Sequence, residues 1–174
     1  MGFFRKRITT AELGEYLARN VAVILQIPTN EALILDYLVK NTSLDEASAR
    51  FEVMCLLAIA FDNAILANVS SVRSREDVLA SFYYTLKDIL QHWSGDAEGT
   101  EKSLFARIAK YHEALESGQL ASGLPAIVRA FMDVCIGEGQ GSMDDYVIFT
   151  AKTMALLSTF TQGANKMIQQ YKLV

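Results

Sequence analysis

Apolar residues recur every three or four positions along most of this chain of 174 residues, which is the pattern of one face of an α-helix. No run alternates between apolar and polar residues as a half-buried β-strand does. The pattern predicts about seven helices, over residues 10–26, 29–41, 44–69, 75–93, 101–117, 124–136 and 143–171.

Four short motifs mark the starts of predicted helices. Thr9–Glu12 and Ser43–Glu46 match the capping box, in which a hydroxyl and a carboxylate satisfy free backbone N–H groups. Ser74–Asp77 and Ser142–Asp145 have the same form with the shorter acid. The glycine-rich stretch 137–141, just before the last motif, predicts a hinge between two helices.

Two predicted helices are apolar on more than one side and therefore need partners on more than one side. Helix 44–69 is apolar almost all round between Val53 and Phe61, and we place it at the centre of the fold together with helix 143–171. If helix 143–171 is not fully covered, we expect its second stripe to be a dimer surface. Its first stripe is Val147, Thr150, Met154, Leu157, Ala164 and Ile168, and its second is Phe149, Leu156, Phe160 and Met167.

The composition is that of an all-α bundle with one domain. Apolar residues make up 51% of the chain, so a chain of this length can bury a core of its own without a disulfide or a metal. Proline occurs only twice, which favours long uninterrupted helices. We divide the chain into an aromatic and basic segment, residues 1–8, and a single helical domain, residues 9–174.

The net charge and the cysteines indicate which classes of partner and which cellular compartment to expect. The net charge of −4 argues against nucleic-acid binding, because such a chain repels polyanions. Cys55 and Cys135 both lie in apolar runs and form no secreted-type framework, which predicts a reducing, cytoplasmic environment. The longest apolar run, residues 53–61, falls short of the roughly 20 residues of a transmembrane helix.

Asp62 and Asn63 interrupt the most apolar predicted helix. A buried carboxylate must be paired or protonated, so such a group is a candidate catalytic or binding site. The alternative is that Asp62 forms an ion pair across the bundle, or that the helix is exposed at this point.

The two histidines are the other candidates for chemistry. His92 follows Asp88 by one helical turn, so the carboxylate could orient its ring, although a histidine stabilising a helix C-terminus has the same pattern. His112 and Glu116 have the spacing of two metal ligands on one helix face, but no third ligand lies nearby in the sequence. We therefore expect no metal and no cofactor.

No nucleotide-binding loop, nucleophile elbow or Cys-x-x-Cys motif is present in the sequence, so we expect no catalytic activity. The leading hypothesis is a protein-interaction or regulatory module that forms a homodimer or binds a protein partner. One alternative is a small-molecule binder or enzyme with a pocket between the central helices. Another is a peripheral membrane protein that uses Phe3–Arg7, because aromatic and basic residues together suit a membrane surface.

Overall fold

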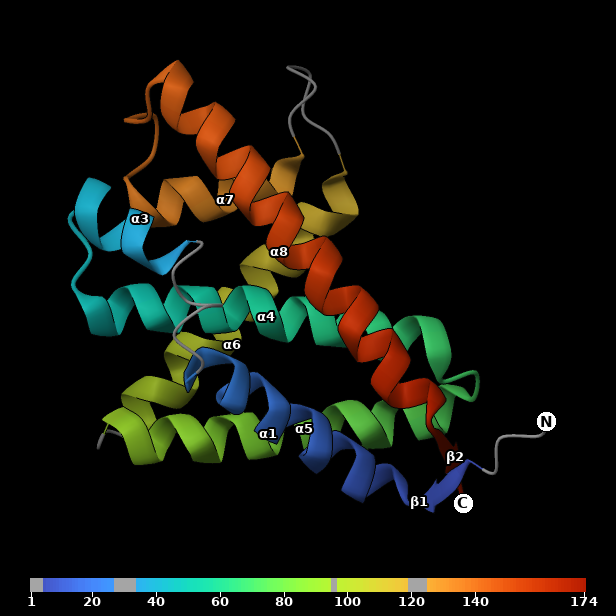
Figure 1. Cartoon of the computed structure of the whole chain (residues 1–174). Coiled ribbons are helices and arrows are strands. Elements are labelled where there is room, and N and C mark those ends of the chain that lie inside the picture. Colours follow the sequence, from blue (N-terminus) through green and yellow to red (C-terminus); the bar gives the residue numbers. More distant parts are fainter. Residues whose placement is uncertain (1–4, 27–33, 95–96, 119–124) are drawn as a thin grey trace.

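The computed structural model describes residues 5–26, 34–94, 97–118 and 125–174 (Figure 1). These ranges hold seven helices and two strands of three residues each, which confirms the predicted all-α fold. The helices are α1 (Thr10–Gln26), α3 (Leu35–Asn41), α4 (Glu46–Asn68), α5 (Val72–Ser94), α6 (Ala97–Ser117), α7 (Ala126–Cys135) and α8 (Met143–Gln169), and the strands are β1 (Lys6–Ile8) and β2 (Tyr171–Leu173).

Helix α4 crosses the middle of the bundle and is buried on all sides between Glu52 and Asp62 (Figure 1). It contacts α1, α3, α5, α6, α7 and α8. Because almost every side chain over these three turns is apolar, each neighbour finds an apolar face to pack against. The polar residues of this segment, Glu52 and Asp62, are therefore placed inside the fold.

By length and composition alone, α4 is also apolar enough to cross a membrane, with a mean hydropathy of 1.5 over 18 residues. Within the described part of the chain it is the one helix with this property. However, 72% of that window is buried inside the fold. The central helix of a globular bundle has this same character, so the hydropathy is accounted for by burial.

Of the four predicted helix starts, the first and the last form the predicted capping boxes. The other two predictions are wrong by a few residues. Helix α4 begins after Asp45 and not after Ser43, because the Asp45 carboxylate accepts the backbone N–H of the first turn at 2.7 Å. Helix α5 begins two residues before Ser74, whose own N–H donates to the Ser71 hydroxyl at 3.3 Å.

Helix α8 crosses α4 obliquely and packs against it with one face, and apolar side chains on its other face are exposed, so the prediction of a second central helix is not confirmed (Figure 1). The predicted dimer stripe is wrong, since Phe149 and Leu156 of that stripe are buried. The exposed apolar side chains are Met143, Val147 and Met154. Burial on α8 cuts across the two predicted stripes, because Leu157, Ala164 and Ile168 of the first stripe are buried as well.

Helices α1 and α5 pack at an unusually close distance. Gly14 lies at the contact, where a Cβ atom would lie 2.4 Å from the carbonyl oxygen of Val78 and 2.8 Å from the backbone nitrogen of Phe82. No side chain fits at such distances, so glycine is what allows the two backbones to approach.

The two ends of the described chain pair as a small parallel sheet, which the sequence did not predict. Lys6 pairs with Tyr171, Arg7 with Lys172 and Ile8 with Leu173. The predicted last helix therefore ends at Gln169 and not at residue 171. Strand β1 belongs to the predicted aromatic and basic segment, whose residues 1–4 lie outside the described residues.

Candidate functional site

Helix α4 brings two carboxylates, Glu52 and Asp62, into the interior of the fold. Their residues are 4% and 3% exposed. They lie about 15 Å apart along the helix axis, since each residue of an α-helix rises 1.5 Å. Each carboxylate has its own set of partners, and we describe the two sets in turn.

Asp62 joins α4 to α5 and α6. Its Oδ2 accepts the Tyr83 hydroxyl at 2.6 Å and lies 2.8 Å from Nε2 of His112. Its Oδ1 is buried and has no hydrogen-bond partner among the described residues. The hydrogen bond to Asp62 raises the pKa of His112, and burial opposes that shift. Burial and the neighbouring carboxylate raise the pKa of Tyr83, so its hydroxyl keeps its proton.

Two of the predicted site residues, Asp62 and His112, thus come together, and the others do not. Asn63 is half-buried beside Asp62. His92 is exposed near the end of α5, and its Nδ1 lies 2.8 Å from the backbone oxygen of Asp88 and not from the carboxylate. The structure therefore agrees with the alternative, a histidine in the last turn of a helix.

The spacing of His112 and Glu116 does not produce a metal site. His112 is turned toward Asp62, whereas Glu116 is exposed and acts on the imidazole only through its charge. Among the described residues, no three histidine, cysteine, aspartate or glutamate side chains are grouped so that they could hold a metal ion.

A histidine held by a buried carboxylate can serve as a general base when its second nitrogen faces a substrate. Here the His112 side chain is 33% exposed, but neither of the two cavities described below is lined by Asp62 or by His112. Asp62 ties α4 to α6 through His112 and to α5 through the hydroxyl of Tyr83.

Stability should depend on pH through His112. Because the folded pKa of His112 is raised, its contribution is fully present below its unfolded pKa of about 6.5 and is lost as the pH rises through the folded value. We expect the free energy of unfolding of the wild type to fall over this pH range. In His112→Gln this decrease should be absent. Urea denaturation at a series of pH values measures it. His92→Gln is the matched control and should keep the fall, whereas an unchanged profile in His112→Gln would contradict the ion pair.

Glu52 lies in a second polar cluster, which the sequence analysis missed. Its Oε1 is 2.9 Å from Nη2 of Arg107, and its Oε2 accepts the Tyr111 hydroxyl at 2.9 Å. Burial raises the pKa of Glu52, and Arg107 acts in the opposite direction. The same burial raises the pKa of Cys55 and of Cys135, so both thiols stay protonated and are poor nucleophiles.

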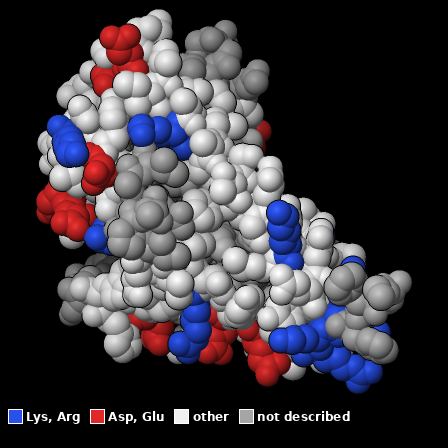
Figure 2. Space-filling model, in the orientation of Figure 1, with Lys and Arg blue, Asp and Glu red and all other residues white. Residues whose placement is uncertain are grey.

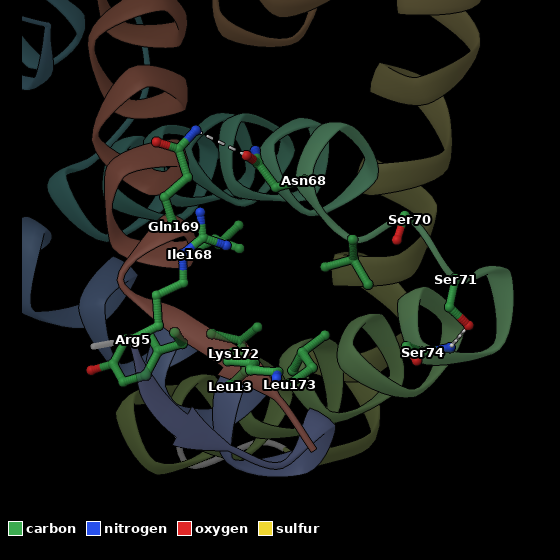
Figure 3. A pocket seen from close by; sticks show the side chains of 12 residues that line it. Arg5, Leu13, Asn68, Ser70, Ser71, Ser74, Ile168, Gln169, Lys172 and Leu173 are labelled. Carbon is green, nitrogen blue, oxygen red and sulfur yellow. Dashed lines mark hydrogen bonds between the residues drawn. The ribbon is translucent and has the colours of Figure 1, made fainter. Parts of the chain in front are cut away.

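A cavity of about 450 Å³ lies where the end of α4, the start of α5 and the paired strands meet (Figure 3). Its lining combines two cations, several hydroxyl and amide groups, and an apolar floor. The lining residues are Arg5, Leu13, Asn68, Val69, Ser70, Ser71, Ser74, Ile168, Gln169, Tyr171, Lys172 and Leu173. The sequence analysis did not find this site, because its residues come from four separate parts of the chain.

The second cavity is an aromatic groove of about 380 Å³ between α5 and α6. Tyr83, Tyr84 and Phe105 line it, and an ion pair between Lys87 and Glu101, 3.4 Å long, borders it. Lys87 and Glu101 neutralise each other in this ion pair. The surface that remains for a ligand in the groove is therefore mainly aromatic.

The third surface feature is the outer face of α8. Figure 2 shows that the surface over the middle of this helix is largely free of charged side chains. In the N-terminal half of α8, Met143, Val147 and Met154 are 77%, 63% and 41% exposed on this outer face. Exposed apolar side chains at helical spacing are typical of a helix that packs against a partner.

In comparisons with known proteins, the chain matches no family model, no curated protein and no solved structure.

Proposed function

We propose that this chain is a non-catalytic protein-interaction module that forms a homodimer, with α8 of one copy packed against α8 of a second copy. The observation that carries the proposal is the exposure of Met143, Val147 and Met154 on one side of α8, opposite the face that packs against α4. Monomeric proteins rarely leave contiguous apolar surface uncovered, and covering it with a second copy would stabilise both.

The side chains between these apolar residues suit close packing of two helices. Ala151, Ala155 and Ser158 are exposed on the same side of α8 and are small. The distance between two packed helices depends on the size of the side chains at the contact, so small residues allow the axes to approach closely.

The charges along α8 favour an antiparallel arrangement. Asp144 and Lys166 are both exposed, and each lies eleven positions from Ala155, on opposite sides of it. If the two-fold axis passes near Ala155, Asp144 of each copy meets Lys166 of the partner copy. Charge pairs at the edges of helix–helix contacts set the orientation of the partners.

Sedimentation velocity over a range of protein concentrations tests the proposal. We expect the wild type to form a dimer and Val147→Glu to weaken the dimer by about 100-fold or more, because a carboxylate would be buried in an apolar contact. Val72→Glu is the matched control, since Val72 is 64% exposed on α5 and Val147 is 63% exposed on α8.

A charge exchange tests the antiparallel arrangement in the same instrument. We expect Asp144→Lys to weaken the dimer by about tenfold, because it would place two like charges side by side, and Asp144→Lys with Lys166→Asp to restore it. A wild type that remains monomeric at every concentration, or a Val147→Glu variant that dimerises as tightly, would contradict the proposal.

A further inference from the structure

The cavity at the junction of α4, α5 and the strand pair has a lining with an uneven charge. Arg5 and Lys172 contribute positive charge, and none of the lining residues is an aspartate or a glutamate. No ion pair is recorded for either cation within the described part of the chain. In a protein whose net charge is −4, this is a local excess of positive charge without a counter-ion.

The strand pairing is what brings the two cations together. Arg7 pairs with Lys172 across the sheet, and the backbone N–H of Lys6 donates to the Gln170 carbonyl at 3.1 Å. Arg5 precedes this hydrogen bond directly. In Figure 3 Arg5 lies on one side of the opening, and Ser70 and Ser71 lie on the other.

Hydroxyl and amide groups complete the polar part of the lining. Ser70, Ser71 and Ser74 come from the connection between α4 and α5 and from the first turn of α5. On the opposite side, the amide nitrogen of Gln169 donates to Asn68 Oδ1 at 3.2 Å, as Figure 3 shows. These groups supply neutral hydrogen-bond partners around the two cations.

The floor of the cavity is apolar. Leu13, Val69 and Ile168 line it and are themselves almost fully buried. A cavity of about 450 Å³ falls within the size range of small-molecule sites, and an apolar floor accommodates the organic part of a ligand.

We propose that this cavity binds an organic phosphate monoester. A monoester carries close to two negative charges at neutral pH and three acceptor oxygens, which match two cations and the surrounding hydroxyl donors. The organic body would lie on Leu13, Val69 and Ile168. The same phosphate chemistry occurs in a free metabolite and in the headgroup of phosphatidic acid, and the experiment separates these two sources.

The test is a titration of the ¹⁵N-labelled full chain with phenyl phosphate, followed by amide chemical shifts. We expect saturable shifts that are confined to the lining of the cavity, at residues 5, 13, 68–74 and 168–173. Arg5→Gln with Lys172→Gln should weaken binding by about tenfold or more, because charge-assisted hydrogen bonds are lost. Arg19→Gln with Lys40→Gln is the control, since it removes two positive charges from exposed positions elsewhere and should leave binding unchanged.

Flotation with two kinds of vesicle identifies the source of the phosphate. One contains equal parts of phosphatidylcholine and phosphatidic acid, and the other contains phosphatidylglycerol, a phosphodiester, in place of phosphatidic acid. Saturable shifts with flotation only on phosphatidic acid indicate a lipid headgroup, and saturable shifts without flotation indicate a soluble ligand. The proposal is overturned if the shifts do not saturate, if they spread over the surface, if the double variant binds equally well, or if vesicles bind whereas phenyl phosphate does not.

Discussion

Replacing Phe82 with alanine is expected to lower the free energy of unfolding by about 3–5 kcal/mol, which makes it the most damaging single change we consider. Phe82 is fully buried on α5. Its ring is stacked on that of Phe61 of α4, with ring centroids 6.3 Å apart. It also makes an edge-to-face contact with the ring of Tyr83, with ring centroids 5.1 Å apart. The close approach of α1 at Gly14 keeps the surrounding backbone from collapsing into the space that alanine would leave.

Urea denaturation measures this loss, and the slope of the transition should stay unchanged. Tyr84→Ala is the matched control, because Tyr84 is the neighbouring aromatic on the same helix but is 65% exposed. It should change stability by less than about 0.5 kcal/mol. A loss below about 1 kcal/mol for Phe82→Ala would falsify the assignment of this face of α5 to the core.

Replacing Arg107 with methionine is expected to cost about 3 kcal/mol, because Glu52 would lose its cation inside the fold. The Glu52 side chain is 5% exposed and that of Arg107 is 26% exposed, so some water can reach the remaining carboxylate. For this reason we place the loss at the lower end of the range for broken buried ion pairs. The Tyr111 hydroxyl donates to Glu52, and we expect this hydrogen bond to remain in the variant.

The loss in Arg107→Met should grow with pH. Burial already raises the pKa of Glu52, and removing the opposing effect of Arg107 raises it further. A carboxyl group with a raised folded pKa contributes stability below its unfolded pKa of about 4.3 and loses it as the pH rises through the folded value. Urea denaturation should therefore show a small loss in the free energy of unfolding near pH 4 and a large loss at neutral pH. Glu52→Gln in the Arg107→Met background should recover most of the loss at neutral pH, and an equal loss at both pH values would contradict this account.

The position of each long helix along the chain was largely predictable, because each long helix repeats its apolar pattern over several turns. Helix α1 was predicted with its observed bounds, and the stripe of α5 is buried at Val78, Phe82, Leu86 and Leu90. The strand pair was missed, because three residues are too few to show a period of two. The exposed side of α8 was misassigned, because packing buries residues of both apolar stripes and leaves Val147 and Met154 of the first stripe exposed.

Of the two buried polar clusters, the sequence could indicate only the carboxylates, which both lie on α4. It could not indicate their partners on other helices. Asp62 stood out because it interrupts an apolar run, and it is indeed buried and paired. Glu52 directly precedes the same apolar run, and a carboxylate at that position could have indicated the second buried cluster. Tyr83 and Arg107 could not be found, because only the crossing of α4 with α5 and α6 identifies them as partners.

The central claim is that two copies meet along α8, and cross-linking at the proposed two-fold axis tests it most directly. Cys55 and Cys135 are buried, so a single introduced surface cysteine dominates mild oxidation. With Ala155→Cys we predict a disulfide-linked dimer, because two copies of this position would face each other at the axis. Val72→Cys, at an equally accessible position on α5, should stay unlinked. If Ala155→Cys stays unlinked where the wild type sediments as a dimer, or if Val72→Cys links as readily, the α8 interface is wrong.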